Sequence, residues 1–540
     1  MITRASRYYH TLRYLRPSQV TLRVWAACKE RAGLARLPAP PVSLTAGLSP
    51  AVPFLTWDPA RGRGDPERGA FRFLNREADL GRPVNWQPPG LPLLWQFHLH
   101  YFQYLHALDR AAQVALCEEW VRANPPGATV GWHPYPTSLR IVNWRKAGMD
   151  TPALLASLYQ QAAYLYRHVE AYHPGNHLLE NARALLFAGT AFAGQGEAGR
   201  WRRRGLALFR ARTPDQVLAD GGDCERSPMY HALMLEAYAD VLNLLPPGHP
   251  DAILFAAVVA RMSDFLLSLT HPDGAIALFN DSTTEIAPPT ADLLAYASAV
   301  RGRAPRAGAS FADTGYFVCR APDLALFIDG GPIGPDYLPA HAHADTFSYE
   351  LSLHGHRFVT DTGVCEYAAG PMRRHARSTA AHNTICVDGV DHAECWGSFR
   401  VARRFPPERV SYACDAGSCR FEGHFGGYRA LIGDGITLRR VIEGEAPARS
   451  LLVQDEVEGS GTHAVESRVH LHPDVSLSTT GRRVTLARSG ATAALDILSG
   501  ALTVSDGWYC PEFGARIANR VLVISARGPR PARLSYRITY

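Results

Sequence analysis

Through the first three hundred residues, apolar side chains recur every three to four positions, which is the spacing that lines one face of an α-helix. In one such segment Leu154, Leu158 and Leu165 follow this repeat. Ser227-Pro228 adds a helix start, because Ser caps helix N-termini and Pro is favoured at the first helical position. The pattern predicts helices over 151–172, 177–192, 227–245, 251–270 and 289–300.

After about residue 310 the apolar period changes to two, and Gly and Asp turns interrupt the runs, as expected for β-strands. The predicted strands cover 316–319, 324–328, 347–353, 357–360, 451–454, 468–472, 521–525 and 533–538. Helices followed by strands favour an all-α domain and then an antiparallel β domain, and successive helix pairs suit an α/α toroid. We expect an N-terminal helix and an extended, Pro- and Gly-rich wrap at 1–90, a helical domain at 91–308 and a β domain at 309–540.

The composition is that of a globular protein, with 46% hydrophobic and 20% charged residues among 540. Only two of the 56 basic residues are lysines, Lys29 and Lys146. Neither lies in a Walker-A context, which excludes that class of nucleotide-binding protein, and lysine Schiff-base chemistry is disfavoured. The net charge of +6 is mild and no long basic run occurs, so nucleic-acid binding is not indicated. Ten Cys at irregular spacings, without a CxxC pair, give no zinc-ribbon or disulfide framework.

The N-terminal segment MITRASRYYHTLRYLRPSQVTLRVW is basic but contains no continuous apolar stretch, so it predicts an amphipathic helix rather than a secretory signal. No segment reaches the roughly 18 uninterrupted apolar residues of a membrane span. The sequence therefore predicts a cytoplasmic protein, with the periplasm as the alternative.

Two polar clusters lie at predicted helix starts. Asn176, His177 and Glu180 are spaced three and four residues apart and share one helix face. In the segment 220–231 a Gly-rich turn places Tyr230 and His231 in the first turn of the next helix. Each cluster fits an ordinary capped helix as well as a functional site, and both interpretations stay open.

Two further clusters fall in the β domain. His341 and His343, in the segment HAHAD, lie two residues apart just before a predicted strand and therefore face the same side of an extended chain. Asp361 and His382 follow 18 and 39 residues after His343. Two His and one Asp are an ordinary zinc ligand set. With 22 His in the chain, spacing alone does not establish that these residues converge.

Eight motifs follow one another along the chain: WQFHLHYFQYL (95–105), GWHPYPTSLRIVNW (131–144), GNHLLENARALLFAG (175–189), DGGDCERSPMYH (220–231), HPDGAIALFNDS (271–282), GPDYLPAHAHADTFSYELSL (334–353), RSTAAHNTICVDG (377–389) and WGSFRVARR (396–404). Taken in this order, they resemble the heparinase II/III superfamily of polysaccharide lyases. The resemblance implies an α+β multidomain fold, an incomplete (α/α) toroid followed by an antiparallel β-sandwich. It also implies cleavage of uronate-containing polysaccharides, such as heparan sulfate or alginate, by β-elimination, which leaves a 4,5-unsaturated uronate end.

The resemblance further implies roles for single residues. Asn176 and His177 would hold the substrate carboxylate, and Tyr230 would protonate the leaving oxygen and serve as base for one C5 epimer. His341 would be the base for the other epimer. A structural zinc ion bracing the β domain is implied at His343, Asp361 and His382. Substrate-binding candidates are Glu180, Arg226, His231, Trp132, Tyr135 and Arg140, with core packing equally open for the Trp; Arg373, Arg374 and Arg377 are further guanidinium candidates.

Two departures leave the function open. Many relatives carry His-Phe-Glu where this chain has Asp223-Cys224-Glu225, which puts the identity of the substrate in doubt. The missing export signal favours processing of the cell's own exopolysaccharide. The alternatives are a toroidal glycoside hydrolase using a pair from Glu180, Glu225 and Asp281, and a non-catalytic polysaccharide-binding or biosynthetic accessory protein. The expected partner is an acidic polysaccharide, and a homodimer stays open.

Overall fold

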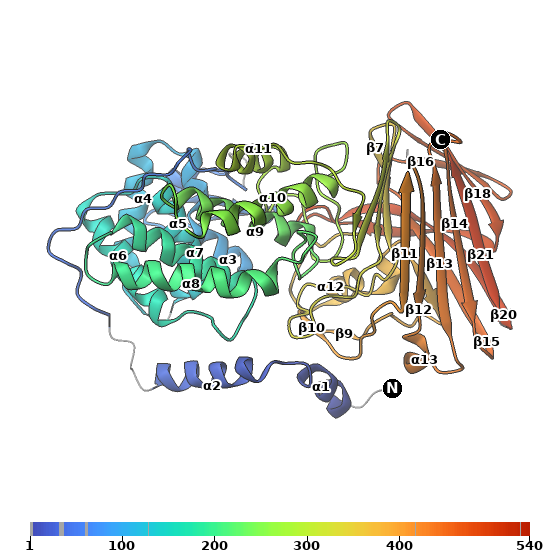
Figure 1. Cartoon of the computed structure of the whole chain (residues 1–540), viewed down its shortest axis with the longest axis horizontal. Helices are drawn as coiled ribbons and strands as arrows, with labels where there is room; N and C mark the ends of the chain where they lie inside the picture. The colour runs from blue at the N-terminus through green and yellow to red at the C-terminus, as the bar shows by residue number, and fades with distance from the viewer. Residues whose placement is uncertain (1–3, 32–36, 60–62, 128, 416, 530) are drawn as a thin grey trace.

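Helices fill the N-terminal part of the computed structural model and strands fill the rest (Figure 1). The structure describes residues 4–31, 37–59, 63–127, 129–415, 417–529 and 531–540. The longer helices are α1 (Arg4–Leu12), α2 (Pro17–Arg31), α3 (Leu93–Tyr101), α4 (Arg110–Ala123), α5 (Pro134–Lys146), α6 (Pro152–Arg167), α7 (Asn176–Ala191), α8 (Ala198–Gln216), α9 (Pro228–Leu244), α10 (Ala252–Ser268) and α11 (Thr290–Arg301). The short helices α12 (Pro371–Ala376) and α13 (Tyr428–Leu431) lie among the strands.

The helical body is built around α7, in which every residue except His177 and Thr190 is buried. Two helices begin where the sequence predicts. The Ser227 hydroxyl accepts a hydrogen bond from the Tyr230 amide at the start of α9, and the Thr151 hydroxyl caps α6 in the same way. Six buried Trp fill the core of this body, which are Trp86, Trp95, Trp120, Trp132, Trp144 and Trp201. The helical pattern of the sequence therefore predicted the toroid-like body correctly.

Most of the described strands form three antiparallel sheets. The eight-stranded sheet runs β11 (Arg409–Asp415), β12 (Ser418–Phe425), β13 (Thr437–Glu445), β14 (Ser450–Glu458), β21 (Ala532–Thr539), β18 (Ala491–Ser499), β17 (Arg483–Arg488) and β16 (Ser476–Thr480). The four-stranded sheet runs β19 (Ala501–Tyr509), β20 (Ile517–Pro529), β15 (Thr462–His470) and β8 (Ile385–Val387). The five-stranded sheet runs β3 (Ser310–Phe311), β4 (Tyr316–Ala321), β5 (Leu324–Asp329), β6 (Tyr349–Leu353) and β7 (His356–Val359).

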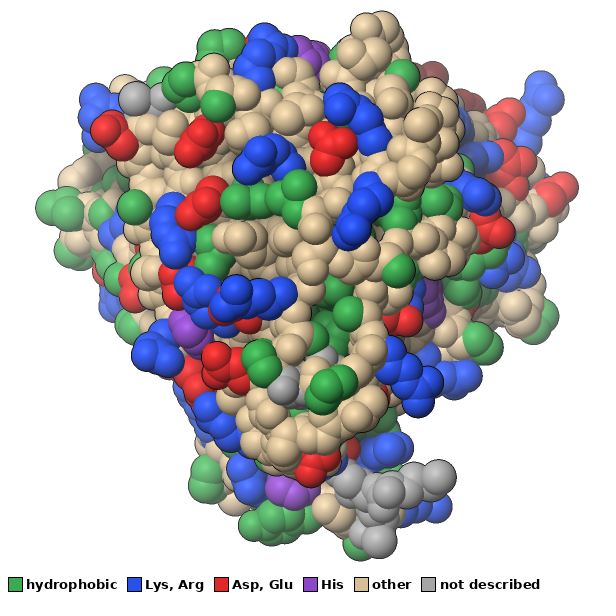
Figure 2. Space-filling model, turned by 90° about the vertical axis from the view of Figure 1, so that its right-hand side faces the viewer, with side chains coloured by type: hydrophobic (Ala, Val, Ile, Leu, Met, Phe, Trp, Pro, Cys, Tyr) green, Lys and Arg blue, Asp and Glu red, His purple; other side chains and the backbone are tan. Residues whose placement is uncertain are grey.

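Burial alternates along the outer strands, as in β14, because one face of the sheet packs on the sandwich core and the other faces solvent. Figure 2 shows that acidic and basic side chains are interspersed over this end of the molecule. A β9–β10 hairpin (Cys395–Trp396 and Arg400–Val401) and α12 lie between the sandwich and the helices. The predicted antiparallel β-sandwich is thus confirmed.

Strand β5 lies where the two domains meet, and all its residues are buried. Ala325 and Phe327 pack with Phe265 of α10, whereas Leu326 and Ile328 belong to the sandwich core. Alternate side chains of one strand thus enter two different cores, and this fixes the helical body against the sandwich.

The N-terminal region differs from the prediction in two ways. The expected single helix is two helices, α1 and α2, because Pro17 starts the second. The predicted wrap contains a short hairpin, β1 (Ala70–Phe73) and β2 (Arg76–Asp79). Parts of both predictions, at 1–3, 34–36 and 60–62, lie outside the described residues. None of the described helices has the length and apolar character needed to cross a membrane.

A buried ion network lies at the centre of the helical body. Lys146 Nζ lies 2.8 Å from Glu236 and 2.9 Å from Asp240, and its side chain is 2% exposed. Arg183 binds both of these carboxylates and also Glu180. Burial raises the pKa of Glu236, but Lys146 and Arg183 outweigh it and bring that pKa to about 2. Two cations thus compensate the charge of three carboxylates whose side chains are at most 8% exposed.

We expect Lys146→Met to lower the free energy of unfolding by about 3–5 kcal/mol, since it leaves buried negative charge uncompensated. Lys29→Met is the matched control, because Lys29, the other lysine of the chain, is partly exposed and donates to the Arg167 carbonyl only. Lys29→Met should lower the free energy of unfolding by about 1 kcal/mol. Urea unfolding of both variants measures the difference, and equal losses would contradict a structural role of the network.

Candidate active site

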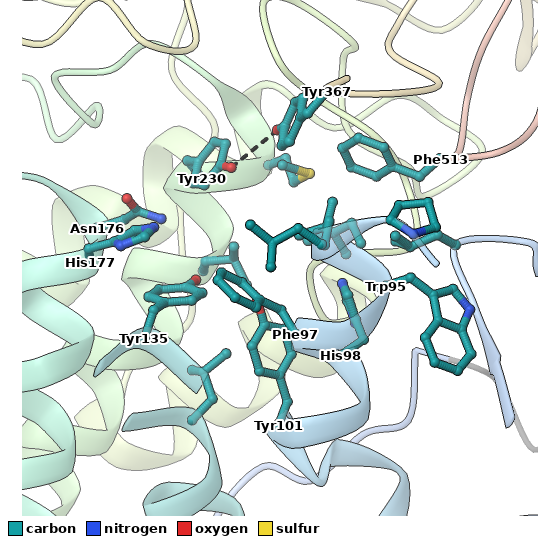
Figure 3. A pocket seen from close by; sticks show the side chains of 18 of the residues that line it. Trp95, Phe97, His98, Tyr101, Tyr135, Asn176, His177, Tyr230, Tyr367 and Phe513 are labelled. Carbon is teal, nitrogen blue, oxygen red and sulfur yellow. Dashed lines mark hydrogen bonds between the residues drawn. The ribbon is translucent and has the colours of Figure 1, made fainter. Parts of the chain in front are cut away.

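A cavity of about 870 Å³ lies between the helical body and the sandwich (Figure 3). Helices α3, α5, α7 and α9 line one side, and the sandwich segments 340–341, 365–368, 398–399 and 513–514 line the other. Nine Phe, Trp and Tyr side chains contribute to the lining, among them Phe97, Tyr101 and Tyr135. The cavity therefore offers aromatic surfaces on which sugar rings can stack.

All four predicted catalytic residues line this cavity: Asn176, His177, Tyr230 and His341. Asn176 and His177 begin α7, directly after Gly175. A Cβ at Gly175 would lie 2.5 Å from Leu338 and 2.9 Å from Glu225 Oε1, so only glycine allows these side chains to approach the start of α7 so closely. The helix starts predicted from the sequence thus bring these residues to the boundary between the domains.

The His177 ring is fixed from two sides. It stacks on Tyr135 with a centroid distance of 4.1 Å and an interplanar angle of 19°, and its Nδ1 lies 3.2 Å from Glu170 Oε1. Burial raises the pKa of Glu170, but His177 outweighs it and leaves that pKa below its usual value. Tyr135, predicted as a substrate contact, therefore lies in the cavity and also orients His177.

The Tyr230 hydroxyl points toward the middle of the cavity and lies 3.1 Å from the Tyr367 hydroxyl (Figure 3). The Tyr230 ring stacks on His341 with a centroid distance of 3.8 Å. Burial raises the pKa of Tyr230 well above its usual value, and the neighbouring Tyr367 raises it further. The phenol is therefore protonated at neutral pH and can donate a proton.

His341 is held at both ring nitrogens. Its Nδ1 lies 3.0 Å from Asp281 Oδ2, and its Nε2 lies 3.5 Å from Glu225 Oε2. Burial lowers the pKa of His341, and Asp281 opposes this without reversing it. Burial, followed by the charge of Asp223, raises the pKa of Glu225 to about 8. The imidazole is therefore neutral at neutral pH and has a fixed orientation.

Asp281 is shared between the cavity wall and the interior of the sandwich. Besides His341, its carboxylate binds His343 Nε2 at 2.8 Å and both terminal nitrogens of Arg373. The side chains of Asp281, His343 and Arg373 are fully buried. Arg373 therefore neutralises the charge of Asp281. Its two terminal nitrogens are bound by this carboxylate and are not available to a substrate.

The sequence did not reveal Tyr367 as a member of the site. It lies in the segment 365–368, where no helical or strand period and no recognisable motif marks it. Its hydroxyl reaches Tyr230 across 137 positions of sequence, and only the tertiary fold brings them together. Arg373 and Arg377 were candidates for substrate contact, but Arg377 is buried and donates to the Ala342 carbonyl.

Four of the six predicted substrate contacts do not line the cavity. Arg140 is fully buried, donates to Gln161 and the Gly131 carbonyl, and lies over the Trp120 ring. Trp132 is buried and its indole donates to the Asn124 carbonyl. Both side chains belong to the core of the helical body, so the prediction for Arg140 was wrong, and for Trp132 the alternative of core packing holds.

The other two residues face away from the cavity as well. The Arg226 guanidinium donates to the carbonyls of Thr314 and Asp313 and so ties the start of α9 to the sandwich. His231 bonds the Met262 carbonyl at 2.8 Å, and burial lowers its pKa to about 4. Glu180 does line the cavity, although Arg183 binds its carboxylate.

The metal prediction is corrected at one position. His343, Asp345 and His382 offer ligand atoms that all lie within 4.8 Å of one another. Asp361 is not in this group, since its Oδ2 lies 2.7 Å from His382 Nδ1 and its Oδ1 accepts from the Gly363 amide. Asp361 therefore lies outside the cluster as the partner of His382, and Asp345 stands in the position that the sequence predicted for Asp361.

The free atoms of this cluster fit a metal ion. His343 Nδ1, Asp345 Oδ2 and His382 Nε2 are buried and have no hydrogen-bond partner among the described residues. The opposite nitrogens of both imidazoles are bound by carboxylates, Asp281 for His343 and Asp361 for His382. Two imidazoles and one carboxylate, each oriented by an outer partner, suit Zn²⁺.

Comparisons with known proteins agree with this arrangement. The family model described as Heparinase II/III N-terminus matches residues 148–295, and the one described as Heparinase II/III-like, C-terminal matches residues 303–536. The chain is 26% identical to a heparin-sulfate lyase of Pedobacter heparinus, over 57% of this chain and 54% of that protein. It is 23% identical to a heparin-sulfate lyase of Bacteroides thetaiotaomicron, over 56% and 53% of the two chains. The chain thus spans about half the length of the curated relatives it matches.

Solved structures show the same fold. A crystal structure of heparinase III superposes with a TM-score of 0.64 at 16% identity, covering 98% of this chain and 93% of that one. The heparan sulfate lyase HepC from Pedobacter heparinus superposes with a TM-score of 0.55 at 19% identity, covering 96% and 88%.

Proposed function

Since matches to its N- and C-terminal models together cover more than half of the sequence, the chain belongs to the heparinase II/III family, and we propose that it cleaves a uronic-acid-containing polysaccharide by β-elimination. The observation that carries this proposal is the meeting of Asn176, His177, Tyr230 and His341 at one cavity. The named relatives, which are heparin-sulfate lyases, support the reaction class.

The reaction removes the C5 proton of a uronate and expels the oxygen at C4, so that a C4=C5 double bond forms. Proton removal places negative charge on a group that already carries a carboxylate, and this charge must be stabilised. In the proposal, the Asn176 amide and His177 do this at the carboxylate. The Tyr135 stack and Glu170 hold the His177 ring in place for that task.

Two proton transfers remain. His341 is neutral and can accept the C5 proton of one epimer, while Asp281 and Glu225 fix its ring. Tyr230, whose raised pKa keeps it protonated, would donate to the leaving oxygen. For the other epimer, Tyr230 would first have to lose its own proton, so that its phenolate takes the C5 proton and then donates that proton to the leaving oxygen.

The charge of the lining favours a substrate without sulfate groups. The lining has three carboxylates, Glu180, Glu236 and Glu366, against two guanidiniums, Arg76 and Arg183. Arg183 is already bound by three buried carboxylates. A sulfated chain would bring several further negative charges to this surface, and like charges at an interface cost several kcal/mol.

We expect unsulfated heparosan to be cleaved about tenfold faster or more than heparin, which has a related backbone with sulfates, since tenfold corresponds to only about 1.4 kcal/mol. The rise in ultraviolet absorbance from the C4=C5 bond measures both rates, and alginate and hyaluronate complete the panel. Faster cleavage of heparin would refute the substrate class and leave the lyase proposal standing. No absorbance with any substrate would refute the lyase proposal itself.

The hydrolase alternative is disfavoured by the carboxylates. Hydrolysis needs two facing carboxyl groups about 5–10 Å apart beside the sugar. Asp281 is bound by Arg373, His341 and His343, and Glu225 is 2% exposed and does not line the cavity. Reducing ends that appear without ultraviolet absorbance would restore this alternative.

For the metal cluster we propose one zinc ion bound by His343, Asp345 and His382. Such an ion would link the segment before β6 to the segment before β8 and would supply structural cross-linking of the sandwich. The elimination steps above use only side chains of the cavity.

A further inference from the structure

The N-terminal strap, defined as residues 4–31 with helices α1 and α2, lies along the outside of both domains (Figure 1). On the helical body, Arg16 pairs with Asp215 at 2.7 Å and Lys29 donates to the Arg167 carbonyl. On the sandwich side, Trp396 donates to the Thr11 hydroxyl at 3.1 Å. The inner face of the strap is thus fixed by polar contacts.

The outer face of the strap is apolar. Val20, Val24 and Trp25 of α2 are 51%, 59% and 63% exposed. Val20 and Val24 lie one turn apart on the same side of the helix, and Trp25 lies about 100° around the helix from Val24. On α1, Tyr9 and Leu12 are 63% and 56% exposed at a spacing of three. Aliphatic and aromatic side chains, here called the exposed stripe, are therefore exposed on both helices, interspersed with polar residues.

The positive charge of the protein is concentrated in the same segment. Residues 1–31 contain six Arg and one Lys against one Glu, a net charge of +6 that equals the net charge of the whole chain. The remaining residues contain equal numbers of basic and acidic side chains. Among the described residues, Arg16 is the one strap cation paired with a carboxylate. The exposed stripe is therefore flanked by unneutralised guanidiniums.

We propose that the strap binds the surface of an anionic lipid bilayer. A helix with an exposed apolar stripe, Trp and Tyr side chains and flanking Arg residues has the character of an interfacial membrane helix. Guanidiniums interact with anionic headgroups, and the apolar stripe enters the boundary between headgroups and acyl chains. An acidic polysaccharide or a nucleic acid would satisfy the cations but would leave Leu12, Val20 and Val24 in water. This inference does not depend on the proposed lyase activity.

Cosedimentation of the full chain with vesicles tests the proposal. We expect binding to vesicles of phosphatidylglycerol mixed with phosphatidylcholine, at least about tenfold weaker binding to pure phosphatidylcholine, and weakening with added salt. The double variant Val24→Glu/Trp25→Glu should lower the affinity for the anionic vesicles about tenfold or more. Because both side chains are exposed, circular dichroism and turnover should stay unchanged.

The matched control is Ile253→Glu/Leu254→Glu, which places the same two charges at neighbouring residues of α10 that are 83% and 41% exposed. It should bind vesicles like the unchanged chain. Lack of vesicle binding, equal binding to neutral vesicles, or equal losses in the control would overturn the proposal. Binding to soluble acidic polysaccharide that the Val24→Glu/Trp25→Glu variant retains, without vesicle binding, would identify the strap as a polyanion site instead.

Discussion

Tyr230→Phe is expected to lower kcat by about 10²–10⁴-fold, the usual contribution of a general acid or base. The substitution removes one hydroxyl oxygen, which lies at the cavity and reaches Tyr367, while the ring keeps its stack on His341. KM should change little, because the lost interaction belongs to the transition state. Initial rates from the ultraviolet absorbance of the product give both constants.

The control for this variant is Tyr238→Phe, which removes a buried hydroxyl from the same helix. The Tyr238 hydroxyl bonds Thr213 and does not line the cavity. Its loss should leave turnover intact and cost about 1 kcal/mol of stability. Tyr367→Phe should give an intermediate loss of rate, since it removes a partner of Tyr230. Retention of full turnover by Tyr230→Phe would assign the proton transfer to another group.

Loss of the proposed zinc ion is the second large effect that we expect. Elemental analysis of the purified chain should find about one equivalent of zinc, and His343→Ala or Asp345→Ala should abolish it, because each removes one of three ligands. Asp361→Asn should weaken zinc binding only about 10–100-fold, since it alters the orientation of His382 and not the ligand set. Zinc at a free concentration 1,000 times its Kd adds about 4 kcal/mol to the free energy of unfolding. Chelation should therefore lower the melting temperature.

His392→Ala separates metal loss from general damage to the sandwich. His392 is buried in the same domain and bonds the Ile385 carbonyl, outside the cluster. It should lower stability while retaining the metal. If Asp361→Asn abolishes zinc binding and Asp345→Ala does not, the ligand set predicted from the resemblance holds and the geometric assignment fails.

The local periods of the sequence predicted the main helices and many strands, because each element carries its own repeat. Sheet order could not be predicted in this way: β21, the last strand, lies between β14 and β18, and β8 pairs with β15. These pairings depend on which apolar faces meet in the folded chain, and many orders satisfy the same period.

The motifs predicted the positions of residues at helix starts, such as Tyr230, because capping fixes where a helix begins. The catalytic roles of these residues stay predictions. Arg140 was misassigned because a guanidinium in a motif suggests a ligand, whereas here carbonyls and an aromatic ring bind it in the core. Asp345 and Asp361 are both carboxylates near His382, and only the direction of their oxygen atoms distinguishes a ligand from its partner.

Asp281 and the three side chains that meet at it have an evolutionary consequence. One carboxylate binds His341 at the cavity, His343 at the metal cluster and both ends of the Arg373 fork. A substitution at any of these positions changes the effect that a substitution at each of the others has. Their effects on fitness are therefore epistatic rather than additive. Drift in this lineage should therefore retain or lose these four residues together, whereas the aromatic lining of the cavity can diversify one residue at a time as substrates change.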